Sequence, residues 1–372
     1  MNFELPPPSS FPPPGSCSLG LATRPRTLPA LAASLLLLPL LASAHAAEAP
    51  PPRSLDEVRA VLARAPAPPD ADQLRELRIV LLADAKDHGA EEHDYPLWQQ
   101  RWRVLLGGSQ GSDASTPLNL YGPPAVPGLD DRSGAPRLKV ETAWHWPSRQ
   151  QWESADAVVA FCYLPWNEAR FQEVAAYLAR GGGLVLVHSA TWTMPGPSER
   201  VAALTGVGGF TRYRHGPVEL EIATDHPLGL GLPPRLSFLD ETYWPPTPAE
   251  HAARIQVLAS SKESLGSTPD RGAPQPVFWL CEPDPGRVFG CVLGHYTWTF
   301  DDPYFRLLLL RGIAWSARES PYRLDALALP GARANGVINA GVWSGRRTPR
   351  APCNPLPRPP SAPHRGRSRT AG

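Results

Sequence analysis

Short apolar runs alternate with amphipathic stretches through the middle of the chain. Residues 184–187 (LVLV) lie between three glycines and a polar segment, which is typical of a strand buried on both faces of a sheet. Residues 168–180 carry apolar side chains at helical spacing, with Asn167 as a suitable N-cap and Gly181 as a terminator. Because another apolar run precedes this helix, the pattern predicts a right-handed βαβ sheet.

The same alternation continues on both sides of this segment. Further strands are expected at 78–83, 138–143, 157–161, 218–223, within 236–244 and at 255–259, and as a hairpin over 276–282 and 287–294. Further helices are expected at 55–63, 96–106, 147–153, 198–204 and 303–317. The expected fold is one flavodoxin-like α/β domain, with a mostly parallel sheet and helices on both faces.

The N-terminal region has the layout of a secretory signal peptide. Arg24 and Arg26 precede an apolar stretch over 28–41, and Ala42-Ser43-Ala44 matches an A-x-A cleavage site. The apolar stretch is short and interrupted by proline, which disfavours a stable membrane span, with an uncleaved anchor as the alternative. We expect a signal peptide with a Pro-rich leader over 1–47, cleaved near Ala44, and export to the periplasm or the medium.

Composition separates a folded part from two tails. Proline makes up 47 of the 372 residues and clusters at both ends, which indicates segments that do not pack into a core. The net charge of +1 is uneven, because residues 326–372 hold eight arginines and no acidic residue. The rest is therefore acidic and offers no basic surface for nucleic acid. We expect a linker over 48–77, a folded domain over 78–323 with an inserted loop at 107–136, and a tail over 324–372; the pattern leaves the oligomeric state open.

Two cysteines fall in the expected hairpin. Cys281 and Cys291 lie on its two strands and face each other in one register. Export would permit a disulfide between them. The favoured interpretation is two unpaired small side chains in the core, with the disulfide as the alternative.

Polar and aromatic side chains follow four of the expected strands. The four exits are residues 84–94, His188 with Ser189, residues 240–244, and residues 294–296. Parallel strands bring their carboxyl ends to one edge of a sheet, which is where α/β proteins bind ligands. The sequence therefore predicts one cleft at this edge.

The residues at these exits suit a carbohydrate ligand. Aromatic faces stack on the C–H groups of a sugar ring, while carboxylates and imidazoles bind hydroxyls and move protons. The candidate catalytic residues are His188, Asp240, Glu241 and His295. The candidate substrate-binding residues are His88, His93, Ser189, Trp192, Arg214, His215, Tyr243, Tyr296 and Trp298.

Other chemistries fit these residues less well. His88, His93, His188 and His295, with nearby carboxylates, offer enough ligands for a divalent metal, but their spacing matches no metal motif. The sequence therefore leaves a metal cofactor open. A serine hydrolase places glycines around its nucleophile, and the sequence VHSA at 187–190 has none.

Several motifs occur in order between residues 78 and 322. They read KDHGAEEHDYPLW, TAWHWP, YLARGGGLVLVHSATW, YRHGPVEL, DHPL, LDETYW and GRVFGCVLGHYTWTFDDPYFRLLLLRGIAW. Together they resemble the ThuA-like (trehalose utilisation) family. The resemblance implies a class I glutamine amidotransferase-like sandwich and a role in handling sugars, including keto-sugar derivatives of disaccharides, but it fixes no reaction.

One position departs from the amidotransferases of this fold. Their nucleophilic cysteine lies at the turn after the central strand, and by this comparison His188 takes its place. An imidazole does not perform the thioester step of a thiolate, so glutaminase activity is not expected. The expected function is an exported protein that binds and processes a carbohydrate or keto-sugar derivative, as an isomerase or a hydrolase. A non-catalytic sugar-binding protein and a metal-dependent hydrolase are the alternatives.

Overall fold

The computed structural model describes residues 48–336, except residues 68, 123–128, 130, 253 and 265–271. All the elements below lie in the second of two structural units, Ala49–Gly372. The expected signal peptide and most of the expected tail lie outside the described residues. No helix in the described part has the length and apolar character that a membrane crossing requires.

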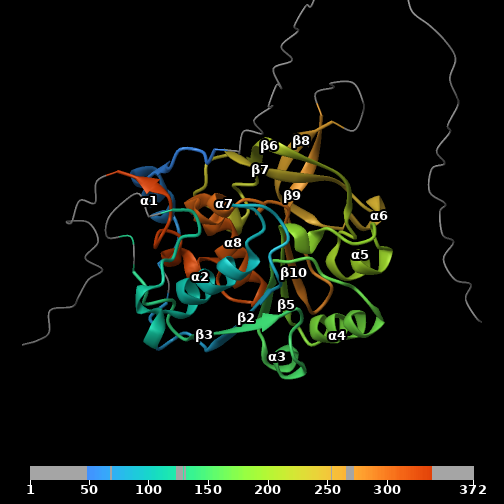
Figure 1. The fold of residues 1–372 in the computed structure, drawn as a ribbon, viewed down its shortest axis with the longest axis horizontal. Coiled ribbons are helices and arrows are strands. Elements are labelled where there is room, and N and C mark those ends of the chain that lie inside the picture. Colours follow the sequence, from blue (N-terminus) through green and yellow to red (C-terminus); the bar gives the residue numbers. More distant parts are fainter. Residues whose placement is uncertain are drawn as a thin grey trace, which may run out of the picture. The chain divides into compact units, whose positions relative to one another are not determined.

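A mixed sheet of nine strands forms the centre of this unit (Figure 1). In spatial order the strands are β3 (Leu138–Trp144), β2 (Leu77–Ala83), β4 (Ala157–Ala160), β5 (Gly183–Val187), β10 (Arg287–Cys291), β9 (Ala273–Cys281), β8 (Gln256–Glu263), β6 (Phe210–Ile222) and β7 (Arg235–Pro246). The pairs from β3 to β10 are parallel, and the pairs from β10 to β7 are antiparallel. The expectation of a mostly parallel sheet is therefore wrong, because consecutive strands pair as hairpins in this half of the sheet: β6 with β7, β8 with β9, and β9 with β10.

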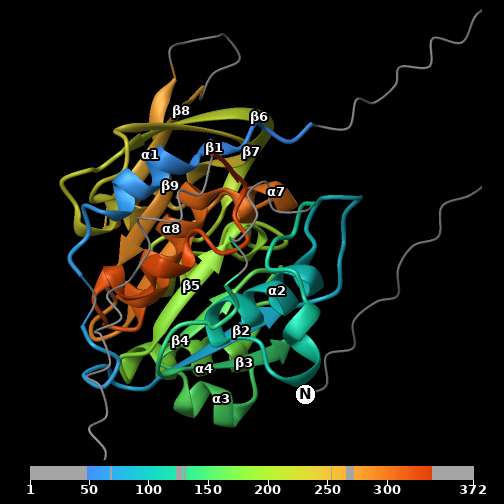
Figure 2. The same cartoon turned by 90° about the vertical axis from the view of Figure 1, so that its left-hand side faces the viewer.

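The parallel half has the strand order of a flavodoxin-like sheet. In sequence order its strands lie as 2-1-3-4-5, so the order reverses between β2 and β4. Helices α2 (Tyr95–Gly107) and α8 (Pro303–Ser316) cover one face, and α3 (Arg149–Ser154) and α4 (Glu168–Ala179) cover the other (Figures 1 and 2). The shorter helices are α5 (Glu199–Thr205), α6 (Ala249–Ala252) and α7 (Thr297–Asp301), with 3₁₀ turns at Gly111–Ser115, His188–Thr191, Pro227–Gly229 and Pro321–Leu327.

Helix starts follow the capping residues of the sequence. The Asn167 side chain accepts the N–H of Arg170 at the start of α4. The Asp302 carboxylate accepts the N–H groups of Tyr304 and Phe305 at the start of α8. These contacts confirm the expected helix starts near 168 and 303.

The long hairpin of β6 and β7 extends further than the sequence predicted. Residues 240–244, expected as a polar strand exit, lie inside β7 and pair with residues 212–216 of β6. The apolar pattern fails over the first half of β6 because most side chains there are exposed or half-buried. As a consequence, Glu241 and Tyr243 reach the site described below from the interior of a strand.

The folded unit also extends beyond both expected boundaries. In the expected linker, α1 (Leu55–Leu62) buries Leu55, Val58 and Val61 against the core, close to the predicted helix at 55–63. The strand before it, β1 (Arg53–Ser54), pairs with β11 (Ala334–Asn335) from the expected tail. Both segments therefore belong to the folded unit in the described structure.

Cys281 and Cys291 are both free. In the β9/β10 pairing, Cys281 lies opposite Val288 and Cys291 lies opposite Phe278. The register in which the two cysteines face each other is therefore not the one observed. Cys291 is buried and Cys281 is half-buried.

Candidate functional site

Segments far apart in the sequence meet in one pocket of about 440 Å³. They follow the carboxyl ends of β2, β4, β5 and β10, and β6 and β7 close the pocket from the antiparallel half of the sheet. The predicted convergence of strand exits therefore occurs. The lining residues are His88, Glu92, His93, Tyr163, Trp192, Met194, Tyr213, His215, Glu241, Tyr243 and His295.

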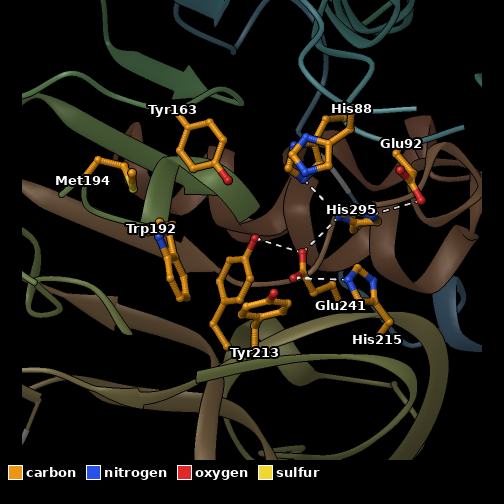
Figure 3. Close-up of a pocket in the computed structure, with 11 residues that line it drawn as sticks. His88, Glu92, Tyr163, Trp192, Met194, Tyr213, His215, Glu241 and His295 are labelled. Atoms are coloured by element: carbon orange, nitrogen blue, oxygen red, sulfur yellow. Dashed lines mark hydrogen bonds and ion pairs between the residues drawn. The ribbon is translucent and has the colours of Figure 1, made fainter. Parts of the chain in front are cut away.

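The pocket has an apolar side and a charged side (Figure 3). Tyr163, Trp192 and Met194 lie on one side, and the imidazoles and carboxylates of His295, Glu241 and neighbouring residues lie on the other. Such a division suits a ligand with both C–H faces and hydroxyl groups.

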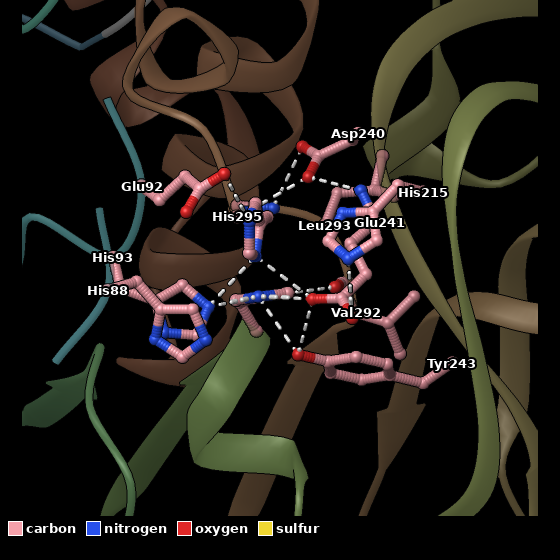
Figure 4. Close-up of polar contacts among 12 residues, drawn as sticks. His88, Glu92, His93, His215, Asp240, Glu241, Tyr243, Val292, Leu293 and His295 are labelled. Carbon is pink, nitrogen blue, oxygen red and sulfur yellow. Dashed lines mark hydrogen bonds and ion pairs between the residues drawn. The ribbon is translucent and has the colours of Figure 1, made fainter. Parts of the chain in front are cut away.

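Four buried side chains form the polar base of the site (Figure 4). We call His93, His188, Glu241 and His295 the four-residue cluster; one ligand atom from each lies within 4.8 Å of all the others. Four contacts join these atoms in a ring. They are His93 Nε2 to His188 Nε2 (2.8 Å), His188 Nε2 to Glu241 Oε2 (3.3 Å), Glu241 Oε2 to His295 Nδ1 (3.0 Å) and His295 Nδ1 to His93 Nε2 (3.0 Å).

The outer nitrogens of two rings are held by hydrogen-bond acceptors. His188 Nδ1 lies 2.7 Å from the carbonyl oxygen of Val292, and His93 Nδ1 lies 2.9 Å from a carboxylate oxygen of Asp87. The Tyr95 hydroxyl donates to the other oxygen of Asp87 at 3.1 Å. Carbonyl and carboxylate oxygens only accept, so each Nδ1 donates to its oxygen, and each ring turns Nε2 toward the cluster.

Two members of the four-residue cluster adopt a left-handed backbone. The φ angle is 42° at His93 and 51° at His188. Such a conformation costs about 1–3 kcal/mol at a non-glycine residue and occurs most often at functional sites. Gly294 lies against this turn, where an added Cβ would stand 3.3 Å from the Cβ of His188.

Burial and charge shift the proton affinities in opposite directions across the cluster. Burial raises the pKa of Glu241, but its contacts with His188 and His295 outweigh burial and hold this pKa well below its usual range. For His295, burial lowers the pKa, and the carboxylates of Glu241 and Asp240 outweigh it and raise the pKa above the usual value. Burial and the neighbouring imidazoles lower the pKa of His93. The result is a buried ion pair between Glu241 and His295 beside a neutral His93.

Two tyrosines at the pocket are poor acids. Burial raises the pKa of Tyr163 to about 12, and burial together with Glu241 raises that of Tyr243 well above its usual value. The Tyr243 hydroxyl lies 2.9 Å from His188 Nε2 and donates to Glu241 at 3.2 Å. It therefore stays a neutral hydrogen-bond donor that links the buried His188 to the pocket.

The structure divides the candidates from the sequence into three groups. His88, His93, Trp192, His215, Glu241, Tyr243 and His295 line the pocket, and His188 lies directly beneath it. The Asp240 carboxylate instead accepts the N–H groups of Glu241 (2.7 Å), His295 (2.9 Å) and Gly294 (3.0 Å), and burial raises its pKa. Asp240 thus holds the 294–295 turn in place.

The remaining candidates lie outside the pocket lining. Arg214 pairs with Glu263 at 2.7 Å, and Ser189 is fully buried. Trp298 stacks on Tyr296 with ring centroids 4.1 Å apart. Tyr296 contacts two pocket residues: its hydroxyl lies 3.3 Å from His215 Nδ1, and its ring packs edge-to-face against His295, with centroids 4.6 Å apart.

Several residues of the site were not predicted. Tyr163 follows β4, so treating that strand end like the other exits would have found it. Glu92 belongs to the polar exit of β2 but was not assigned a role. Met194 and Tyr213 carry no signal in the sequence, because the first lies in a loop and the second in the part of β6 that was not recognised as a strand.

The family match covers the part of the site that follows residue 136 and leaves His88, Glu92 and His93 outside it. The family model ThuA, described as trehalose utilisation, matches residues 136–316. No curated protein shows significant sequence similarity to the chain.

Several solved structures are similar to the chain at low identity. A ThuA-like protein from Bacteroides uniformis is 17% identical, with a TM-score of 0.47, over 69% of this chain and 99% of its own. A ThuA-like protein from Parabacteroides merdae is 18% identical, with a TM-score of 0.44, over 65% and 90%. A β-galactosidase from Rahnella sp. R3 is 14% identical, with a TM-score of 0.41, over 66% and 32%. The family assignment rests on the sequence match: residues 136–316 of the chain are ThuA-like.

Proposed function

We propose that this protein binds a carbohydrate or keto-sugar derivative in the pocket and processes it there, without glutaminase activity. One observation carries the proposal: aromatic side chains and buried proton-transfer groups line the same cavity of about 440 Å³. This volume lies within the range of small-molecule sites and suits a mono- or disaccharide. The family description, trehalose utilisation, agrees with a sugar ligand.

In this proposal, aromatic side chains of the pocket bind the sugar, and its imidazoles and carboxylate transfer protons. Trp192 and Tyr213, whose ring centroids lie 6.1 Å apart, offer faces for stacking on a sugar ring. His295 and Glu241 stand on the opposite side as a proton-donating imidazole and a carboxylate. His188 Nε2, 2.9 Å from the Tyr243 hydroxyl, would accept a proton from the ligand through that hydroxyl, since the His188 ring is fully buried.

Export is part of the proposal. The sequence pattern over 24–44 supports a signal peptide, and these residues lie outside the described structure. We infer a periplasmic or secreted protein that meets its sugar outside the cytoplasm. Fractionation of cells that express the full chain, with N-terminal sequencing of the exported form, tests this inference; an intact N-terminus in the cytosolic fraction contradicts it.

Sugar binding and conversion are tested together. Calorimetry with trehalose, other disaccharides and monosaccharides measures binding, and NMR of the same mixtures detects products. Trp192→Ala should weaken binding by about fivefold, since an aromatic stacking contact contributes about 1 kcal/mol. Glu241→Gln should retain binding and lose about 10²–10⁴-fold in turnover.

Trp144→Ala is the matched control. Trp144 lies on β3, its side chain is exposed, and it is not among the pocket residues, so its removal should leave binding and turnover unchanged. Binding without conversion would identify a non-catalytic sugar-binding protein. Absence of binding to every sugar would reject the proposal.

A further inference from the structure

We propose that the four-residue cluster is a metal centre, in which His93 Nε2, His188 Nε2, His295 Nδ1 and Glu241 Oε2 bind one divalent first-row transition-metal ion. The inference deepens the proposed function, because it assigns a cofactor to the same site. It stands on the geometry of the cluster alone, and metal binding is measured without sugar. The two proposals can therefore fail separately.

The first argument is the placement of protons. His93 Nδ1 donates its proton to the Asp87 carboxylate, and His188 Nδ1 donates its proton to the Val292 carbonyl. Their Nε2 atoms then meet at 2.8 Å with one lone pair each. Two lone pairs repel at this distance, and a metal ion that binds both nitrogens would turn this repulsion into two favourable contacts.

The second argument is the spacing of the donor atoms. The four contacts of the ring measure 2.8, 3.0, 3.0 and 3.3 Å. Nitrogen and oxygen ligands that lie about 2.0–2.2 Å from one ion, at right angles to one another, are roughly 3 Å apart. The donor atoms are thus already at the separations that a shared ion would impose.

The third argument is the support behind the ligands. Metal-binding histidines direct their other ring nitrogen to a carboxylate or a carbonyl, as His93 and His188 do here. For His295 the outer nitrogen is buried and makes no hydrogen bond in the described structure, and it lies 3.5 Å from a carboxylate oxygen of Glu92. With Nδ1 on a metal, His295 Nε2 would carry the proton toward Glu92.

The donor set indicates the class of metal. Three imidazoles and one carboxylate suit zinc, iron, nickel, cobalt or manganese, whereas calcium and magnesium prefer oxygen ligands throughout. His93, Glu241 and His295 line the pocket, so an ion among them would face the ligand. There it would polarise a hydroxyl or carbonyl oxygen of a sugar.

Metal binding to the full chain tests the proposal. Protein treated with a chelator and dialysed is titrated with ZnCl₂, MnCl₂ or NiCl₂ in a calorimeter, and bound metal is counted by elemental mass spectrometry. The expected result is one ion per chain. His93→Asn and His188→Asn should each weaken binding by roughly a hundredfold or more, and asparagine tolerates the left-handed backbone of both positions.

His145→Asn is the matched control. His145 also has a positive φ, of 63°, and its ring is exposed beside Asp84, away from the four-residue cluster. This variant should bind metal like the parent. Equal binding by parent and both cluster variants would overturn the proposal, as would absence of stoichiometric binding by the parent.

A second measurement remains informative if the histidine variants do not fold. A metal that binds only the folded chain raises its thermal midpoint, by roughly 5 °C or more at a hundredfold excess over Kd. Glu241→Gln keeps the shape of the side chain and removes its charge, so the shift should shrink in this variant. No shift in the parent would mean that the cluster holds only a shared proton, which contradicts the proposal.

Discussion

The Nε2 atoms of His93 and His188 lie 2.8 Å apart although the two residues follow strands of the parallel half-sheet that are not neighbours. His93 ends the loop after β2, and His188 follows β5, with β4 between these strands. Both residues reach the contact through a left-handed backbone. Their approach is therefore imposed by the fold, and it places two lone-pair donors at the base of a pocket.

The hydrogen bond between His93 Nδ1 and Asp87 predicts that a substitution outside the four-residue cluster changes metal affinity. Asp87 holds the Nδ1 proton of His93 and also accepts the Tyr95 hydroxyl. Asp87→Asn weakens this orientation, so we expect metal affinity to fall about 10–100-fold while the fold persists. Calorimetric titration with ZnCl₂ measures the change, and circular dichroism checks the fold.

Asp84→Asn serves as the control for Asp87→Asn. Asp84 lies at the same strand exit but pairs with His145, 2.7 Å away, outside the four-residue cluster. The Asp84→Asn variant should bind zinc as tightly as the parent chain. If both variants bind zinc as tightly as the parent, Asp87 does not orient a metal ligand.

The role of Asp240 predicts a loss of stability. Its buried carboxylate accepts three backbone N–H groups, two of them in the 294–295 turn. Asp240→Asn puts an amide donor against an N–H donor, which should lower the free energy of unfolding by about 2–4 kcal/mol. Urea denaturation followed by tryptophan fluorescence measures this change.

An exposed aspartate provides the comparison for Asp240→Asn. The Asp56 side chain lies in the first turn of α1 and is 88% exposed, 3.8 Å from Arg59. Asp56→Asn should change the free energy of unfolding by no more than about 0.5 kcal/mol. Equal small effects of both substitutions would show that the 294–295 turn does not depend on Asp240.

Four strands of the parallel half, β2, β4, β5 and β10, could be predicted because both of their faces are buried. The apolar run 157–161 corresponds to β4, in which every residue is buried. The first half of β6 gave no such signal, because its side chains are largely exposed. Strand direction depends on which strands become neighbours, and the apolar runs alone do not encode that.

The part of the candidate site that directly follows apolar runs could also be predicted. His188 and His295 were found because they follow apolar runs directly. Asp240 and Glu241 were taken as a pair, but both lie inside β7, where successive side chains point to opposite faces of the sheet. Only Glu241 therefore reaches the pocket, and this distinction required the strand to be recognised through residue 246.

The register of β9 and β10 predicts that Cys281 and Cys291 stay unpaired in an oxidising environment. Cys281 pairs with Val288, three residues from Cys291, which separates the two cysteines by roughly 10 Å along the strands. A disulfide requires Cα atoms within about 7 Å. Alkylation of the unfolded chain without reductant, followed by peptide mapping, should label both residues. A peptide pair joined through Cys281 and Cys291 would contradict the observed register.

The turn at His226 predicts a pH-dependent contribution to stability. Its Nδ1 accepts the N–H of Leu228 at 3.2 Å, and burial lowers the pKa of the imidazole below its usual 6.5, with Asp225 acting in the opposite direction. The folded chain therefore binds this proton less readily than the unfolded chain, so the contribution is present above pH 6.5 and is lost as the pH falls through the lowered pKa. His226→Asn keeps an acceptor for Leu228 that does not titrate. Urea midpoints measured between pH 8 and 5 should fall less steeply for this variant than for the parent, and identical slopes would show that His226 does not contribute.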